Sequence, residues 1–305
     1  MNFRPLLEYY QYMRRIYFIF IFIAICGFFS PSDAFQIYSY ADKNTVIGSV
    51  KTHKIKGDES LIEVARRFGI GYNSIVDANP GVDPFIPGSG ISITIPTSWI
   101  LPDMASYDGI IINLSEMRLY LFSKHSAPIV RTYPIGIGSE GNETPVGVFK
   151  ITEKVVKPSW YVPESIRKEK PELPRVVPPG PNNPLGSHAL RLSAKSVLIH
   201  GTNRPFAVGR RASHGCIRMY PEDIPKLFLA VPNRSKVTII RQPVKVGVSN
   251  SRVFIEIHKD EILQMNYFNE AIQLLRKKDL YDSIDKEKML SALREKKGIP
   301  VDITK

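Results

Sequence analysis

The residues best suited to chemistry lie in one short segment, HGTNRPFAVGRRASHGCIR, at positions 200–218. The segment begins with His200, places His214 and Gly215 directly before Cys216, and ends with Arg218. Nucleophilic catalysis by a thiol requires a thiolate, a base that takes its proton, and backbone amides directed at the oxyanion that develops during attack. The segment contains a candidate for each requirement, so it predicts an active site.

The chemistry of each residue type supports this prediction. A free thiol, with a pKa of about 8.5, is mostly protonated at neutral pH unless a base or a cation lowers that pKa. His200 ends an apolar stretch at 196–199 and reaches Cys216 if the intervening loop folds back, with a backbone carbonyl orienting its ring. Gly215 lets the backbone approach a substrate closely, so its amide and that of Cys216 are candidate oxyanion donors. The guanidinium of Arg218 suits a substrate carboxylate, although an ordinary turn with a solvated arginine is the alternative.

The other cysteine, Cys26, lies in an apolar run at 16–29 that follows two arginines and precedes a Ser-Asp-Ala tripeptide. This pattern is typical of a secretory signal peptide, and the run is shorter than the roughly 20 residues that a membrane span needs. We therefore predict a signal peptide at 1–34. The exported chain keeps only Cys216, and a lone thiol in an oxidising compartment is reactive or intermolecular. A buried structural cysteine is the alternative.

Composition argues against several classes of protein. The formal net charge is +12, which favours association with a polyanionic surface or a carboxylate-rich polymer. Nucleic acid is not expected as the partner of an exported protein. The six histidines are scattered and do not have the spacing of metal ligands, so no metal site is predicted. The sequence also has no phosphate-binding loop and no dinucleotide fingerprint, so we expect no cofactor.

Residues 40–97 have the pattern of a small separate domain. A strand at 50–54 is followed by helices at 59–68 and 73–79. Alternating isoleucines at 91–95 predict a closing strand. With the stretches KGDES and IVDANPGVDPFIPGSGISITIP, this βααβ order resembles a LysM module. The resemblance implies binding to N-acetylglucosamine-containing glycans, here peptidoglycan strands, whereas a spacer domain without a ligand is the alternative.

From residue 108 the pattern changes to short β-branched segments separated by Gly, Pro and Ser turns. These segments lie at 109–114, 117–122, 129–137, 147–156, 189–192, 195–200 and 236–241. Many short strands with such turns predict a mostly-β fold, an antiparallel sandwich or barrel, for a catalytic domain at 108–241.

An insertion at 157–186, which we call the lid, interrupts these strands. It holds eight of the 24 prolines and begins with Trp160 and Tyr161. Long loops in compact domains are usually functional or disordered, and prolines reduce the entropy lost on ordering. We predict that the lid covers a substrate with its two aromatic side chains. An exposed insertion without such a role is the alternative.

A C-terminal extension at 242–305 follows the catalytic domain. Its pattern predicts a strand at 252–258 and two amphipathic helices, the second at 285–297 before a glycine and a proline. The extension carries no recognisable chemistry, and we expect His258 to be an ordinary strand residue.

Residues 108–241 resemble the L,D-transpeptidase (YkuD-type) catalytic domain, whose signature is an upstream histidine followed by [S/T]-H-G-C. Here the signature reads as His200 and then Ser213-His214-Gly215-Cys216. The stretches GIIINLSEMRLYLF, YPIGIG, TPVGVFKI and VVPPGPNNPLG also match. Together with the LysM-like module, the chain resembles a subgroup of proteobacterial periplasmic enzymes.

The resemblance implies a role for each site residue. It makes Cys216 the nucleophile and His200 the general base and acid, with the carbonyl of Gly201 orienting His200. It makes His214 and Gly215 part of the oxyanion site. The residues implied to contact substrate are Arg218, Ser213 and the lid aromatics Trp160 and Tyr161. The implied donor is a peptidoglycan tetrapeptide stem, which forms a thioester. The acceptor is a second stem, the lysine of an outer-membrane lipoprotein, or water, as in a carboxypeptidase. A wall-binding protein with a retired catalytic domain is the non-enzyme alternative.

Overall fold

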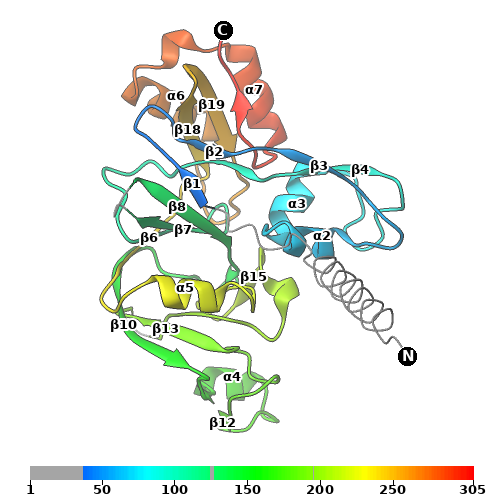
Figure 1. Cartoon of the computed structure of the whole chain (residues 1–305), viewed down its shortest axis with the longest axis vertical. Helices are drawn as coiled ribbons and strands as arrows, with labels where there is room; N and C mark the ends of the chain where they lie inside the picture. The colour runs from blue at the N-terminus through cyan, green and yellow to red at the C-terminus, as the bar shows by residue number, and fades with distance from the viewer. Residues whose placement is uncertain (1–36, 124–126, 195) are drawn as a thin grey trace, which may run out of the picture. The chain divides into compact units, whose positions relative to one another are not determined.

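The computed structural model describes residues 37–123, 127–194 and 196–305 (Figure 1). The predicted signal peptide at 1–34 lies outside these ranges, as does Lys195 at the start of one predicted strand. The described residues all belong to one compact unit, Gln36–Lys305. Within the described ranges no helix is both long and apolar enough to cross a membrane.

The N-terminal region has the predicted βααβ order (Figure 1). Its elements are β3 (Lys51–Lys54), α2 (Leu61–Arg67), α3 (Tyr72–Ala78) and β4 (Ser92–Ile95). Strand β3 pairs antiparallel with β4. Ser60 caps the N-terminus of α2, because its side chain accepts from the Glu63 amide while the Glu63 carboxylate accepts from the Ser60 amide. A second antiparallel pair, β2 (Val46–Gly48) with β5 (Ser98–Ile100), flanks these elements in the sequence.

A nine-stranded sheet forms the centre of the molecule. In spatial order it contains β1 (Ile37–Ser39), β8 (Ile129–Pro134), β7 (Arg118–Ser123), β6 (Ile110–Asn113), β17 (Lys236–Ile240), β10 (Gly147–Val156), β13 (His188–Leu192), β14 (Leu198–His200) and β16 (Ile217–Arg218). The mostly-β prediction is therefore confirmed. Most neighbours are antiparallel as predicted, but β6 with β17 and β14 with β16 are parallel.

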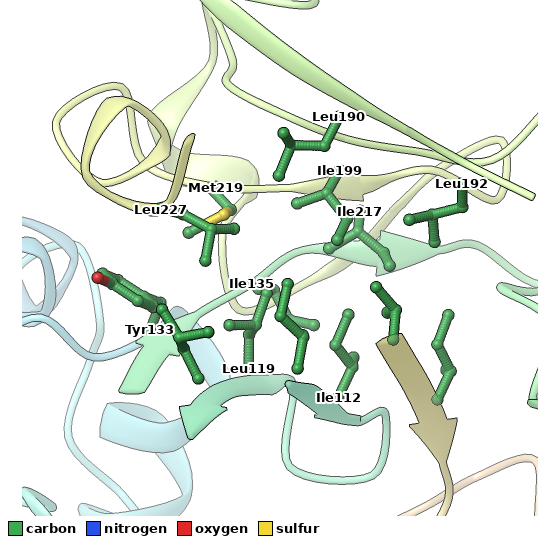
Figure 2. Close-up of a cluster of buried hydrophobic side chains, with 14 of the residues drawn as sticks. Ile112, Leu119, Tyr133, Ile135, Leu190, Leu192, Ile199, Ile217, Met219 and Leu227 are labelled. Atoms are coloured by element: carbon green, nitrogen blue, oxygen red, sulfur yellow. The ribbon is translucent and has the colours of Figure 1, made fainter. Parts of the chain in front are cut away.

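The sheet curls around one hydrophobic core. Gly136, just after β8, exchanges two backbone hydrogen bonds of 2.8 and 2.9 Å with Arg218 in β16, so the last strand of the sheet contacts the segment that follows its second strand. Figure 2 shows the result: Ile112 and Leu119 from one half of the sheet point toward Ile199 and Ile217 from the other half. Helix α5 (Ile224–Ala230) contributes the buried Leu227 to the same core.

The lid has regular structure of its own. Strands β11 (Trp160–Tyr161) and β12 (Val176–Val177) pair antiparallel on either side of α4 (Glu164–Glu169). The fully buried amide of Asn183 donates to the carbonyls of Pro158, Val177 and Pro178 at 2.9 to 3.1 Å. One side chain therefore ties both ends of the lid together.

The C-terminal extension has two more strands than its pattern predicted. Its elements are β18 (Val244–Ser249), β19 (Arg252–Ile257), α6 (Tyr267–Lys277), α7 (Lys286–Glu295) and β20 (Val301–Asp302). Strand β19 lies between β18 and β20, and the buried faces of the helices pack on this small sheet in a core of their own.

A buried ionic network joins the extension to the central sheet. The Lys245 ammonium of β18 lies 2.8 Å from a carboxylate oxygen of Glu116 and 3.0 Å from one of Glu256, and all three side chains are buried. His258, expected to be an ordinary strand residue, also lies here, with Nε2 2.6 Å from Glu256. Burial opposes ionisation of Glu256, but Lys245 and His258 outweigh it and hold the pKa of Glu256 below its ordinary value. The three potential metal ligands Glu116, Glu256 and His258 thus meet around an ammonium group.

Candidate active site

The segment that predicted an active site folds back on itself. Strands β14 and β16 are parallel neighbours, with Ile199 opposite Ile217 and His200 opposite Arg218. His200 is the last residue of β14, and Cys216 directly precedes β16. The loop between them, residues 201–215, which we call the catalytic loop, contains β15 (Arg211–Ser213), and β15 pairs with β9 (Ile137–Gly138).

His200 is buried and held in one orientation. Its Nδ1 lies 2.6 Å from the carbonyl oxygen of Gly201, the contact that the family resemblance implied. Because that oxygen can only accept, Nδ1 carries the proton in this contact, and the backbone of Leu185 is a second hydrogen-bonding partner of the ring. Burial, and secondly the charge of Arg218, lower the pKa of His200 to about 4. The ring is therefore neutral near pH 7 and able to accept a proton.

Cys216 is partly buried, and in the structure its thiol is directed at a backbone carbonyl. Sγ lies 3.5 Å from the carbonyl oxygen of Ser196. Burial raises the pKa of the Cys216 thiol, although the Leu198 amide and the guanidinium of Arg218 act in the opposite direction. Among the described residues no hydrogen bond joins this thiol to His200. The resting pair is thus a neutral thiol and a neutral imidazole on adjacent strands.

The turn before the nucleophile is fixed by side-chain hydroxyls. Gly215 has a φ of +95°, a conformation that favours glycine. Thr144 donates to the carbonyl of Gly215 at 3.0 Å. Ser213, which the resemblance assigned to substrate, is buried and donates to the carbonyl of Cys216 at 2.5 Å. The structure therefore gives the Ser213 hydroxyl a partner within the turn, and its contact with substrate stays a prediction.

His214 points away from this turn toward the lid. Its Nε2 lies 3.3 Å from a carboxylate oxygen of Glu169, at the end of α4. Of the two lid aromatics, Trp160 is half-buried and Tyr161 is 75% exposed. The lid is thus in contact with the nucleophile turn through Glu169, a residue that the sequence pattern did not single out.

The charge of the Arg218 guanidinium acts on both Cys216 and His200. Its backbone is fixed by the two hydrogen bonds to Gly136, and its side chain is half-buried. Burial lowers the pKa of Arg218, and its Nε is buried with no hydrogen-bond partner in the described part of the chain. An unpaired guanidinium donor at this position is suited to an anionic group of a substrate.

The N-terminal region contacts the catalytic loop directly. The first amides of α3 donate to it, from Tyr72 to the carbonyl of Val208 at 3.2 Å and from Asn73 to that of Gly209 at 3.1 Å. The guanidinium of Arg210 lies 3.5 Å from the centre of the Tyr72 ring. The loop between His200 and Cys216 is therefore held by a helix from the predicted glycan-binding module.

Comparison with known proteins identifies the class of enzyme that this fold and this site define. Residues 107–239 match the family model described as the L,D-transpeptidase catalytic domain, YkuD. The chain is 38% identical over 278 residues to the probable L,D-transpeptidase YcfS of Escherichia coli K12, an alignment that covers 85% of each chain. It is 36% identical over 259 residues to the probable L,D-transpeptidase ErfK/SrfK of Salmonella typhimurium, covering 81% of this chain and 83% of that one. The chain belongs to the L,D-transpeptidase family.

Solved structures of the same class are also similar, at a lower level. The NMR structure of the catalytic domain of an L,D-transpeptidase from E. faecium covers 45% of this chain and 100% of that one, at 20% identity and a TM-score of 0.36.

Proposed function

We propose that this L,D-transpeptidase is an exported, wall-associated enzyme of the periplasm that uses Cys216 to form a thioester with peptidoglycan tetrapeptide stems. The observation that carries the proposal is the placement of a neutral, oriented His200 on the strand next to the strand that Cys216 precedes. A neutral base and a thiol that ionises only when it attacks are the two components that nucleophilic acyl transfer requires.

In the first half of the reaction, Nε2 of His200 takes the thiol proton as Sγ of Cys216 attacks the carbonyl carbon of the donor. The amides of Gly215 and Cys216 stabilise the oxyanion of the tetrahedral intermediate. The carbon–nitrogen bond to the terminal D-alanine then breaks, and the amine of the leaving D-alanine receives the proton from His200. Sγ is left as a thioester of the shortened stem.

In the second half, an acceptor attacks the thioester carbon and His200 takes its proton. The thiolate of Cys216 leaves and receives that proton from His200. The acceptor is the amine of a second stem, which gives a cross-link between diaminopimelate residues, or the lysine of a lipoprotein. Water as acceptor gives a carboxypeptidase with the same residues.

Mass spectrometry tests this scheme. The mature protein is incubated with tetrapeptide stems, with and without a lipoprotein C-terminal peptide, and the products are weighed. Cross-linked stems or a stem–peptide conjugate support transpeptidation, and tripeptide alone supports hydrolysis. A protein that neither acylates nor releases D-alanine is the retired wall-binding protein instead.

We further propose that the βααβ module binds glycan strands. Its turn before β4 presents Phe85 and Ile86, which are 58% and 81% exposed. The carboxylate of Asp83 accepts from both of their amides at 2.8 and 2.9 Å, so the turn is ordered before any ligand binds. Exposed apolar side chains of this kind suit the apolar faces of sugar rings.

Substitution of both exposed residues tests glycan binding without disturbing the contact of α3 with the catalytic loop. Phe85→Ala with Ile86→Ala should weaken sedimentation with purified peptidoglycan sacculi and leave acylation by a carbapenem unchanged. Leu229→Ala is the matched control, because Leu229 is 83% exposed on α5, outside the module. Equal sedimentation of the double variant and the control contradicts a role for this turn.

A further inference from the structure

Thr144 is a buried residue that neither the motif nor the proposed mechanism uses. It lies between β9 and β10 in the stretch TPVGVFKI and is 3% exposed. Its Oγ1 accepts from the amide of Gly138 in β9 at 3.0 Å and donates to the carbonyl of Gly215 at 3.0 Å. A hydroxyl has one proton, so these two bonds use the only donor of the Thr144 hydroxyl and one of its acceptor positions. Together they fix the orientation of the hydroxyl.

The second of these bonds determines where an amide of the nucleophile points. The carbonyl of Gly215 and the amide of Cys216 belong to the same peptide unit, and the described residues contain no cis peptide bond. In a planar trans peptide the C=O and N–H bonds point in opposite directions. Because the carbonyl is held on Thr144, the N–H of Cys216 is directed to the opposite side. In the described part of the chain that N–H has no backbone partner.

The surroundings of Thr144 hold its hydroxyl in place. A Cβ at Gly138 would lie 2.0 Å from the carbonyl oxygen of Asn142 and 2.7 Å from the amide nitrogen of Thr144, so this backbone packs directly against β9. On the other side of the nucleophile, Ser213 holds the carbonyl of Cys216. The peptide units before and after Cys216 are therefore each fixed by one hydroxyl.

We propose that Thr144 is a positioning residue for the oxyanion site, which it forms indirectly by aiming the amide of Cys216. The inference rests on the proposed function, because it assumes that Sγ of Cys216 attacks a carbonyl carbon. In the described part of the chain the Thr144 hydroxyl is bonded to Gly138 and Gly215 and not to the thiol. Its removal should slow the reaction only where negative charge develops on a carbonyl oxygen.

Two reactions of the same thiol distinguish this role from general damage to the site. Acylation by a carbapenem passes through a tetrahedral intermediate with an oxyanion on the lactam oxygen. Alkylation by iodoacetamide displaces iodide from a saturated carbon and forms no such oxyanion. Thr144→Val keeps the shape of the side chain and removes its hydroxyl. Loss of one oxyanion donor typically costs about 10²–10³ in rate, and misdirecting one should cost roughly 10- to 100-fold.

We expect Thr144→Val to acylate roughly 10- to 100-fold more slowly than wild type and to be alkylated at nearly the wild-type rate. Thr144→Ser, which restores the hydroxyl, should recover most of the acylation rate. Thr132→Val is the matched control, since Thr132 is equally buried and its hydroxyl accepts from Arg118 in the central sheet. It should leave the ratio of the two rates unchanged.

Three results overturn the inference. Wild-type acylation by Thr144→Val excludes the positioning role, and so does a parallel fall in both rates, because that result indicates damage to the turn as a whole. If Thr144→Val does not fold, Thr144→Ser is the test. A ratio of acylation rate to alkylation rate that differs from wild type in Thr144→Ser also excludes the positioning role. By contrast, a wild-type protein that forms no carbapenem adduct at Cys216 contradicts the proposed function itself.

Discussion

Gly209 offers a quantitative test of the contact between the N-terminal module and the catalytic loop. It lies midway between His200 and Cys216 with a φ of +80°. A Cβ at Gly209 would lie 2.1 Å from the amide nitrogen of Tyr72 and 2.6 Å from the Cα of Gly71. Both are backbone atoms, which cannot rotate away. Gly209→Ala must therefore move either α3 or the catalytic loop.

The magnitude follows from two costs. An alanine in a left-handed conformation costs about 1–2 kcal/mol, and overpacking a closely packed contact costs typically 1–3 kcal/mol more. Gly81 is the matched control because its φ is +84° and nothing lies within 4 Å of a Cβ built there. Gly81→Ala therefore carries only the first cost. Gly209→Ala should be less stable than Gly81→Ala by about 1–3 kcal/mol in free energy of unfolding.

The assay compares urea unfolding midpoints and carbapenem acylation rates of the two variants. Linear extrapolation of the urea curves gives the free energies of unfolding, so the expected difference between the two variants is measured directly. A displacement of about 1 Å in catalytic geometry can cost about 10²-fold in rate, so acylation by Gly209→Ala should also fall well below that of Gly81→Ala. Equal stability and equal acylation rates for the two variants would refute the contact as a determinant of the catalytic loop.

The other predictions concern the chemical groups of the site. Cys216→Ala should fold normally and gain no carbapenem mass in intact mass spectrometry, and an adduct at another residue would remove Cys216 from the mechanism. His200→Ala should slow acylation by about 10²–10⁴-fold, whereas His214→Ala should be milder, and a reversed order of the two losses would exchange their roles. Because burial raises the pKa of Cys216, alkylation of the free enzyme by iodoacetamide should increase with pH to beyond the ordinary thiol value of about 8.5, and a plateau below pH 7 would contradict a neutral resting pair. Arg218→Lys should lose more of the rate with stem peptide than of the rate with a carbapenem, and a parallel fall would place Arg218 on the thiolate rather than on substrate.

Local patterns predicted the longer elements well. The strand predicted at 147–156 coincides with β10, and the helices predicted at 59–68 and 73–79 differ from α2 and α3 by one or two residues at their ends. Helices α2 and α3 each bury one apolar face, so their periodicity is visible in the sequence. Strand β10 buries only Ile151, and its β-branched residues predicted it. The two-residue strands β16 and β20 have no period to detect.

The long-range pairings were not available from local patterns. The parallel pairing of β6 with β17 joins residues more than a hundred positions apart. No local pattern indicates such a pairing, so the sequence analysis predicted only antiparallel strands. The same limit applies to the site. Cys216 and His200 were found from their residue types and spacing, whereas Thr144 and Glu169 act through contacts with the turn at 213–216 that only the fold creates. The stretch TPVGVFKI, which contains Thr144, matches the family, and this match was the signal in the sequence that pointed to Thr144.

The buried ionic network has a consequence for the order in which the chain folds during synthesis. Glu116 follows β6 in the sequence, but its cation, Lys245, emerges from the ribosome 129 residues later. One edge of strand β6 is likewise uncovered until β17 has been synthesised and pairs with it. Domains usually fold from the N-terminus as they are made, and an uncovered strand edge is a template for aggregation. A chain that stops before residue 245 contains the buried Glu116 carboxylate without the ammonium group that neutralises it. Residues 236–305, which supply β17 and Lys245, therefore complete the central sheet, although the described contacts of the Cys216 thiol come from other parts of the chain.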